Sequence, residues 1–188
     1  NRQDKPDWFN APVPGFGDPS ARLLIMGLAP GRGGANRTGR PFTGDWAGDL
    51  LYATLLRFGF ASGEYLARPD DGLRLRDAFI TNAVRCVPPK NKPTGPEIRT
   101  CRPYLLGQIA ALPNLQIIVA LGKIAHDSTV AALGGKISGF KFAHNAAHDM
   151  GRLKLVDSYH CSRYNTNTRR LTVEMFEDVF KKVRGLLE

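Results

Sequence analysis

Three stretches of this sequence gather the polar, aromatic and glycine residues that form ligand sites. They are Gly27 to Gly44 (GLAPGRGGANRTGRPFTG), Thr81 to Cys86 (TNAVRC) and His160 to Thr172 (HCSRYNTNTRRLT). Glycines in the first stretch let backbone N–H groups approach an anion or a flat ring closely, because no Cβ stands in the way. This stretch lacks the Gly-Lys-Ser/Thr of a Walker A loop and does not match G-x-G-x-x-G. Neither common nucleotide-phosphate loop is therefore indicated.

Each of the three stretches follows an apolar segment that is typical of a β-strand. These segments are Arg22 to Leu28, Ala78 to Val84 and Leu153 to Val156, and a fourth such run covers Leu115 to Leu121. Apolar runs of this length are typical of parallel strands covered on both faces. Because ligands bind beyond the carboxyl ends of such strands, we expect the three stretches to form one site.

Helical patterns alternate with the strands. Asp45 has the position of an N-cap before a run of leucines, Thr94 and Glu97 form a T-x-x-E capping box, and a short helix is expected after Gly122. The last helix carries an apolar stripe of Val173, Phe176, Phe180, Val183 and Leu187. The order predicts an α/β protein, a three-layer α/β/α sandwich with a central, mainly parallel sheet of about four strands. Residues 136–151 show little periodicity and are expected to be a surface excursion.

The composition favours a folded protein that meets polyanions. Its 188 residues fit a single domain over 1–188, and 26 Lys and Arg against 17 Asp and Glu give a net charge of +9. No apolar run reaches the length of a membrane span, and the three cysteines do not resemble a secreted disulfide framework. We therefore expect a cytoplasmic location and no membrane partner. Residues 1–20 carry four prolines and are expected to form an extended N-terminal arm, with a further segment expected before Asn1.

Four motifs together resemble those of the family 5 uracil-DNA glycosylases, relatives of the iron–sulfur family 4 enzymes. They are G27-L-A-P-G, N36-R-T-G-R-P-F-T-G44, P88-P-K-N-K-P93 and H160-x-S-x-x-N-T-x-T-x-R-L-T172, and the match covers nearly all of the chain. The resemblance implies a monomeric repair enzyme that flips uracil out of double- or single-stranded DNA. It then hydrolyses the N-glycosidic bond and leaves an abasic site. Family 5 resemblance also implies activity on other deaminated bases such as hypoxanthine and xanthine.

The resemblance assigns residues to the base pocket. Gly27 and Ala29 belong to the loop that lies against the base, and Phe42 matches the position whose ring stacks on uracil. Asn82 matches the position whose amide reads the base edge, and His160 the histidine that hydrogen-bonds uracil O2 as negative charge develops. Structural roles are the alternatives: a core ring for Phe42, a strand cap for Asn82 and an ordinary structural histidine for His160.

The residue that positions the attacking water is not obvious. The best-known uracil glycosylases carry an acidic residue just before the proline of the first loop, where this chain has Leu28 and Ala29. The role could pass to Asn36, whose amide can orient water, or to Asp45. We favour Asn36 at this point, because an N-cap role already explains Asp45.

The resemblance also points to a cluster and to a DNA-binding rim. Cys86 and Cys101 match the second pair of thiolates that hold a [4Fe–4S] cluster, while the first pair has no counterpart and is expected before Asn1. Arg163 and Tyr164 match the segment that fills the gap left by the flipped base, and Arg40 and Arg169 are expected on the same rim.

Two other functions remain open. A nucleic-acid-binding module without catalysis would explain the missing acidic residue at Leu28 and Ala29. A thiol hydrolase would use Cys161 beside His160, although neighbouring side chains on an extended segment point apart.

Overall fold

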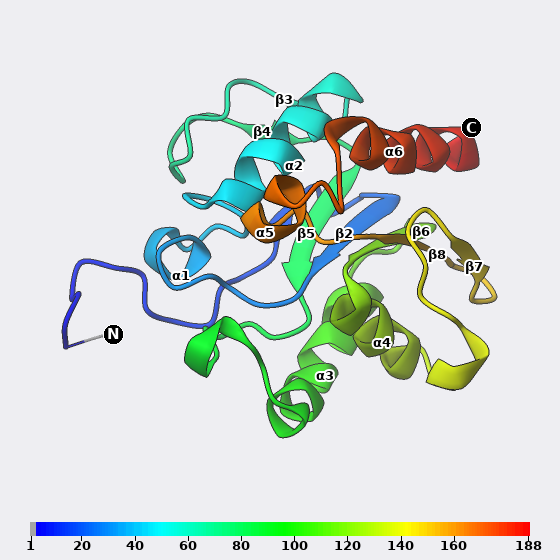
Figure 1. Cartoon of the computed structure of the whole chain (residues 1–188), viewed down its shortest axis with the longest axis horizontal. Helices are drawn as coiled ribbons and strands as arrows, with labels where there is room; N and C mark the ends of the chain where they lie inside the picture. Colours follow the sequence, from blue (N-terminus) through cyan, green and yellow to red (C-terminus); the bar gives the residue numbers. More distant parts are fainter. Residues whose placement is uncertain (1–2) are drawn as a thin grey trace.

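A six-stranded sheet forms the centre of the computed structural model, which describes residues 3–188 (Figure 1). Its strands, in spatial order, are β1 (Phe16–Gly17), β5 (Ala78–Asn82), β2 (Leu23–Gly27), β6 (Ile117–Leu121), β8 (Lys154–Ser158) and β7 (Ala147–Asp149). The four inner strands are mutually parallel, and the two short edge strands run antiparallel to them. The predicted mainly parallel sheet is confirmed, with its four predicted strands at the centre.

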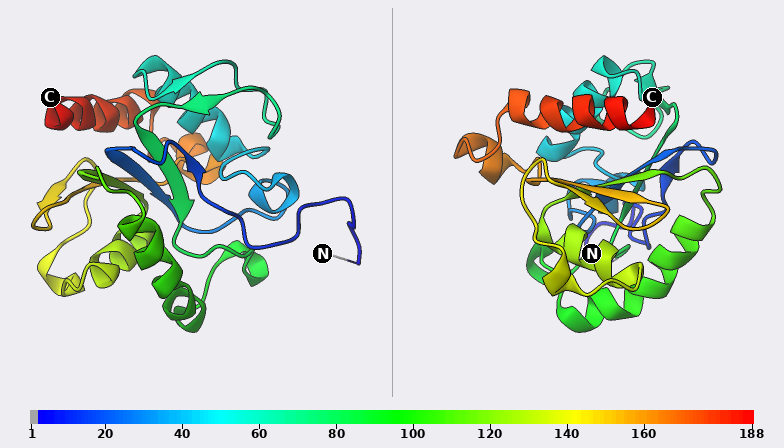
Figure 2. Two further views of the ribbon diagram at one scale, coloured as in Figure 1. Left: turned by 180° about the vertical axis from the view of Figure 1, so that it is seen from behind. Right: turned by 90° about the vertical axis from the view of Figure 1, so that its right-hand side faces the viewer.

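Helices cover both faces of this sheet, as Figures 1 and 2 show. Because successive side chains of a strand point to opposite faces, Leu23 and Ile25 of β2 pack in one core cluster and Leu24 and Met26 in the other. Helices α2 (Trp46–Arg57) and α6 (Val173–Leu187) close the first cluster, and α3 (Gly95–Ala110) and α4 (Lys123–Ala132) the second. The three-layer α/β/α architecture is thereby confirmed.

The predicted helix signals form as expected. The Asp45 side chain accepts a hydrogen bond from the Gly48 N–H and caps α2, and Thr94 and Glu97 form both halves of the capping box of α3. Four of the five predicted stripe residues of α6 are buried. Val173, at the first position of that helix, is instead half exposed.

The structure also contains short elements that the sequence did not predict. The expected surface excursion contains a 3-10 turn (Ile137–Gly139) and β7, and the N-terminal arm contributes β1. A two-stranded ribbon, β3 (Ala61–Ser62) with β4 (Arg74–Leu75), follows α2, and the short helix α1 (Ala35–Thr38) lies within the first glycine-rich stretch. These pieces are held by backbone hydrogen bonds and carry no apolar period that a sequence pattern could detect.

The order of the strands places a binding crevice at the carboxyl end of β2. The chain leaves β2 for β5 on one side and then returns to β6 on the other side of β2. Such a reversal opens a crevice beyond the strand ends, where α/β proteins bind ligands. None of the helices among the described residues is long and apolar enough to cross a membrane.

Candidate active site

A cavity of about 410 Å³ lies beyond the carboxyl end of β2, and its volume is within the size range of small-ligand pockets. All three predicted stretches contribute to its wall, so the expectation of a single site is confirmed. The lining residues are Leu28, Ala29, Pro30, Gly31 and Ala35 after β2, Phe42, Asp45, Trp46 and Ala47 around the start of α2, Asn82 and Asn91 after β5, and His160, Ser162 and Arg163 after β8.

One part of the wall is suited to a flat heterocycle. Phe42 and His160 stack with ring centroids 6.0 Å apart, and Asn82 ends β5 beside them. Two polar atoms here, Asn82 Oδ1 and His160 Nδ1, are buried without a hydrogen-bond partner. Buried polar atoms are rarely left unpaired, so this wall is suited to a ligand that offers hydrogen-bonding groups beside a flat apolar face.

Gly27 supports this wall rather than lining it. A Cβ at Gly27 would stand 2.2 Å from Asn82 Oδ1 and 2.6 Å from the Phe42 ring. Both distances are shorter than any van der Waals contact, so the absence of a side chain lets the amide and the ring approach each other. Ala29 lines the cavity, and the contact between Gly27 and a base stays a prediction.

His160 is held in its neutral form by its surroundings. Burial without a charged partner lowers the pKa of His160 to about 4, because the imidazolium would lose its hydration. Near neutral pH the ring is uncharged, with one N–H to donate and one nitrogen lone pair to accept.

The two candidates for the water-positioning residue lie in different places. Asp45 lines the cavity, and its carboxylate lies against the glycine-rich loop, since a Cβ at Gly34 would stand 2.4 Å from Asp45 Oδ2. Desolvation raises the pKa of this carboxyl above its usual value. Asn36 is buried and does not line the cavity, and its Nδ2 donates to Asn10 Oδ1 at 3.0 Å. The geometry therefore disfavours Asn36: helix α1 uses its amide to fasten the N-terminal arm.

The open side of the cavity carries aromatic and cationic groups. Arg163, at the start of α5 (Arg163–Asn167), lies over the ring of Trp46 at 5.5 Å, and Trp46 Nε1 donates to Thr166 Oγ1. Tyr164 is 72% exposed, and Arg169 is also exposed. The structure thus brings Arg163 to the cavity, and Tyr164 and Arg169 are exposed in the same segment after β8.

Arg40 is not part of this rim. Its side chain is 5% exposed and forms a two-bond ion pair with Asp71, each bond 2.7 Å long. The guanidinium lies over the rings of Phe16, Tyr52 and Tyr65. The expectation that Arg40 contacts DNA was wrong, because the β3–β4 ribbon supplies a buried carboxylate that claims the charge.

The cysteines divide into two kinds. Cys161 is fully buried, and burial raises the pKa of its thiol, which disfavours the thiolate that a hydrolase would need. Cys86 is exposed and Cys101 partly exposed. Among residues 3–188 neither joins a third Cys, His, Asp or Glu in a group close enough to share an ion. These two thiols alone would supply half of the four thiolates that a [4Fe–4S] cluster needs.

Sequence reasoning missed Trp46, Asn91 and Ser162. Trp46 is half exposed directly after an N-cap, and Ser162 caps α5 by accepting a hydrogen bond from the Asn165 N–H. Asn91 adopts a positive φ of 55°, which is uncommon outside glycine. An exposed tryptophan at a helix start was the one signal that could have been read in advance.

The fold and cavity define an α/β protein with a polar and aromatic pocket at the switch point of its sheet. The family model of the uracil DNA glycosylase superfamily matches residues 14–184. A type-5 uracil-DNA glycosylase of Thermus thermophilus is 48% identical over 97% of this chain and 83% of its own length. One from Pyrobaculum aerophilum is 38% identical over 96% of this chain and 79% of its own. A type-4 uracil-DNA glycosylase of Sulfurisphaera tokodaii is 33% identical over 93% and 74%.

The chain therefore belongs to the uracil-DNA glycosylase superfamily and, within it, to the type-5 uracil-DNA glycosylases.

Proposed function

We propose that this protein is a DNA repair glycosylase that hydrolyses the N-glycosidic bond of uracil flipped out of DNA. The observation that carries the proposal is the pair of unpartnered buried atoms, Asn82 Oδ1 and His160 Nδ1, beside the Phe42 ring in a chain of this family. The reaction breaks the bond between C1′ and N1 and places a water hydroxyl on C1′. The proton of that water ends on the released base.

The base is recognised by three side chains. The Phe42 ring stacks on the uracil plane, and Asn82 Oδ1 accepts the N3–H, which also satisfies its unpartnered acceptor. His160 donates to uracil O2, where negative charge grows as the bond breaks. This hydrogen bond is stronger in the transition state than in the ground state, which is the condition for catalysis.

Asp45 holds the attacking water. It is the carboxylate that lines the cavity, at the foot of α2 and against the glycine-rich loop. An ionised carboxylate there orients a water toward C1′ and stabilises the positive charge that develops on the sugar. Asp45 thus takes the water-positioning role in place of Asn36. It supplies the acidic group that the site lacks at Leu28 and Ala29.

DNA contacts come from the open side of the cavity. Arg163, Tyr164 and Arg169 follow β8 and are exposed there, so they meet the phosphates and fill the gap left by the flipped nucleotide. We expect the protein to act as a monomer on double- or single-stranded DNA.

The direct test uses a duplex with one uracil. Free uracil and an alkali-labile abasic site should both appear, whereas a binding module without catalysis would shift the duplex and leave it intact. A panel with hypoxanthine and xanthine in place of uracil, in single- and double-stranded form, ranks the bases and strand states. Failure to release any base would reject the proposed function.

The iron–sulfur cluster is a separate proposal. Cys86 and Cys101 are accessible enough to supply two thiolates, and the other ligands would have to come from outside the described residues. When bound, such a cluster would supply a cross-link between α3 and the segment after β5. Analysis of iron and acid-labile sulfide in the natural protein, isolated without oxygen, tests this. Cys101→Ser should lose both elements, and an iron-free, fully active protein would reject it.

A further inference from the structure

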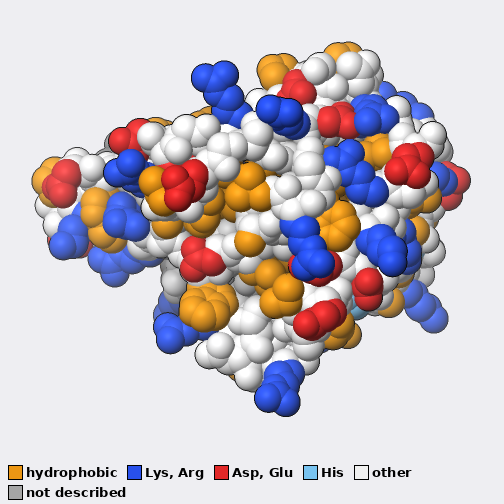
Figure 3. Space-filling view, turned by 90° about the horizontal axis from the view of Figure 1, so that it is seen from above, with side chains coloured by type: hydrophobic (Ala, Val, Ile, Leu, Met, Phe, Trp, Pro, Cys, Tyr) orange, Lys and Arg blue, Asp and Glu red, His pale blue; other side chains and the backbone are white. Residues whose placement is uncertain are grey.

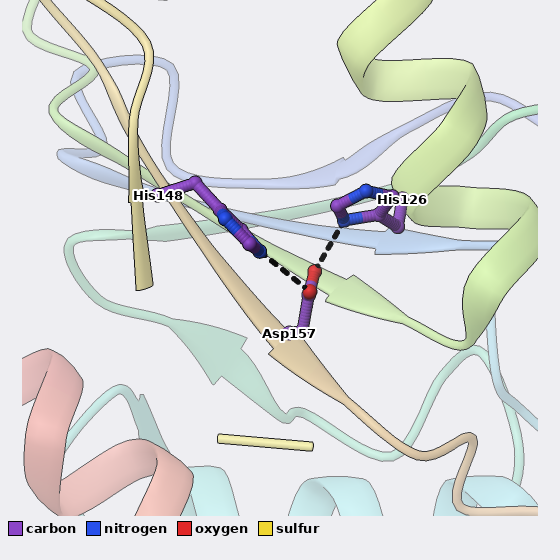
Figure 4. A group of neighbouring side chains, drawn as sticks. All are labelled: His126, His148 and Asp157. Atoms are coloured by element: carbon purple, nitrogen blue, oxygen red, sulfur yellow. Dashed lines mark hydrogen bonds and ion pairs between the residues drawn. The ribbon is translucent and has the colours of Figure 1, made fainter. Parts of the chain in front are cut away.

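A second cluster of chemically active side chains lies away from the cavity. It joins His126 of α4, His148 of β7 and Asp157 of β8, and none of the three lines the cavity (Figure 4). In Figure 4 the two imidazole rings approach the Asp157 carboxylate from opposite sides. His126 and Asp157 are fully buried, and the His148 side chain is 14% exposed.

The Asp157 carboxylate is the centre of this cluster. His126 Nδ1 lies 2.7 Å from Asp157 Oδ1, and His126 Nε2 lies 2.9 Å from the Phe140 carbonyl oxygen. Both ring nitrogens of His126 therefore face oxygen atoms. His148 Nε2 meets the other carboxylate oxygen at 2.8 Å.

The same arrangement brings three metal-ligating groups together. One ligand atom from each of the three residues lies within 4.8 Å of the others. Two imidazoles and one carboxylate form a donor set that suits zinc and related divalent ions. We propose that His126 Nδ1, His148 Nε2 and Asp157 bind a divalent transition-metal ion of the zinc type.

The surroundings provide the outer contacts that metal ligands need. A metal-bound histidine usually donates its other ring N–H to a carbonyl or carboxylate, and His126 Nε2 already faces the Phe140 carbonyl. Asp157 Oδ2 accepts from the Ala143 N–H at 3.3 Å, which fixes the carboxylate. The 136–146 segment thereby orients two of the three ligands.

A limited movement of these side chains would make room for the ion. With bonds of about 2.0–2.1 Å in a tetrahedral site, neighbouring ligand atoms stand about 3.3 Å apart. The present contacts of 2.7 and 2.8 Å to the carboxylate must lengthen by about half an ångström. The two imidazole nitrogens, which lie within 4.8 Å of each other, must reach a similar separation.

The role of this ion would be structural. It would fasten β7, a three-residue edge strand paired only with β8 among the described residues, to helix α4. Any open coordination position would face solvent only beside His148, because His126 and Asp157 have no exposed surface. The proposal is independent of the glycosylase assignment, since it involves none of the cavity residues.

The test is titration of the metal-stripped protein with Zn²⁺ by calorimetry, and with Co²⁺ by visible absorption. We expect one ion per chain and a higher thermal midpoint with metal. A Co²⁺ spectrum without thiolate charge transfer would exclude Cys86 and Cys101 as the ligands.

Variants locate the ion. His148→Gln, at the partly exposed ligand, should abolish the binding and the thermal shift while leaving a folded protein. The matched control is His144→Gln, because His144 lies outside the cluster and bonds to the Met175 and Tyr159 backbone. Absence of stoichiometric binding in the parent, or equal binding by His148→Gln and the parent, would overturn the proposal.

Discussion

His160 carries the sharpest prediction for a single side chain. Because the proposed hydrogen bond to the base would strengthen only as charge develops, His160→Ala should lower the single-turnover rate far more than it weakens DNA binding. Loss of one such donor typically costs about a hundredfold to a thousandfold in rate. His160→Gln keeps a donor of similar reach and serves as the comparison. An unchanged single-turnover rate in the alanine variant would remove the role.

The protonation state of His160 gives a second test. Burial lowers its pKa to about 4, so the ring is neutral through the range where an exposed histidine titrates, near a pKa of about 6.5. The parent rate should therefore show no increase as pH falls through that range. If the rate of the parent rose in that range and the rate of His160→Gln did not, the catalytic group would be an imidazolium.

One substitution can separate the capping role of Asp45 from its proposed role in holding the water. Asparagine caps helices about as well as aspartate, so Asp45→Asn keeps the acceptor for the Gly48 N–H and removes the charge. If Asp45 only capped α2, activity would be retained. We expect a loss of about a hundredfold or more in the chemical step, while Asn36→Ala keeps a rate much nearer the parent's at equal folded fraction.

The raised pKa of Asp45 also fixes the sign of two pH effects. Desolvation raises the pKa of Asp45 in the folded protein above its value in the unfolded chain. The ionised carboxylate therefore destabilises the fold at pH values above the folded-state pKa. This destabilisation disappears as pH falls to the unfolded-state value. Asp45→Asn should therefore be at least as stable as the parent at neutral pH. Activity should fall as pH drops through the pKa of Asp45, and that acid limb should be absent from the residual activity of the variant.

At the scale of elements, Gly27 at the end of β2 and Gly33 in the loop that follows differ in their surroundings. A Cβ at Gly27 would overlap the Asn82 amide and the Phe42 ring, while a Cβ at Gly33 in the same loop meets nothing within 4 Å. Gly27→Ala should displace both base contacts and abolish uracil release. Gly33→Ala is the matched control and should retain it. Equal activity of the two variants would show that the wall adapts.

The Arg40–Asp71 pair joins the first loop to the β3–β4 ribbon. Removing one member of a buried ion pair typically costs about 3–5 kcal/mol, so Arg40→Met should lower the urea midpoint clearly. Arg40 hydrogen bonds hold the pKa of Asp71 well below its usual range, so this contribution is present above about pH 3.9 and is lost as pH falls through the folded-state pKa. The slope of DNA affinity against salt should not change, in contrast to a phosphate-contacting arginine.

The elements show where sequence reasoning succeeded and where it could not. Buried parallel strands such as β2 and β6 leave a continuous apolar signal, and caps such as Asp45 and Thr94 mark helix starts, so the sheet and its helices were predictable. Arg40 looked like its neighbours in an arginine-rich loop, because the carboxylate that pairs with it lies 31 residues further on. The choice between Asn36 and Asp45 likewise depends on which side chain faces the cavity, and sequence spacing alone does not determine that.

At the scale of the whole molecule, the net charge is +9, but the Lys and Arg side chains do not form one continuous patch over the α2 and α6 side (Figure 3). On the face seen in Figure 3, Lys and Arg side chains are interspersed with Asp, Glu and apolar ones. The DNA-binding charge is therefore expected at the cavity opening, where Arg163 and Arg169 follow β8. Bulk positive charge speeds encounter with DNA, while these few arginines set the register.

Salt dependence separates those two contributions. Each phosphate contact releases counterions, so the affinity for a uracil duplex should fall linearly on a log–log plot against salt, and Arg163→Ala should reduce that slope by about one. Arg152 is exposed on the turn between β7 and β8, at the far side of the sheet from α5, and Arg152→Ala removes the same net charge there (Figure 1). Its slope should match the parent. If both variants changed the slope equally, net charge rather than a contact at the cavity opening would explain binding. If affinity did not depend on salt at all, phosphate contacts would contribute little to binding.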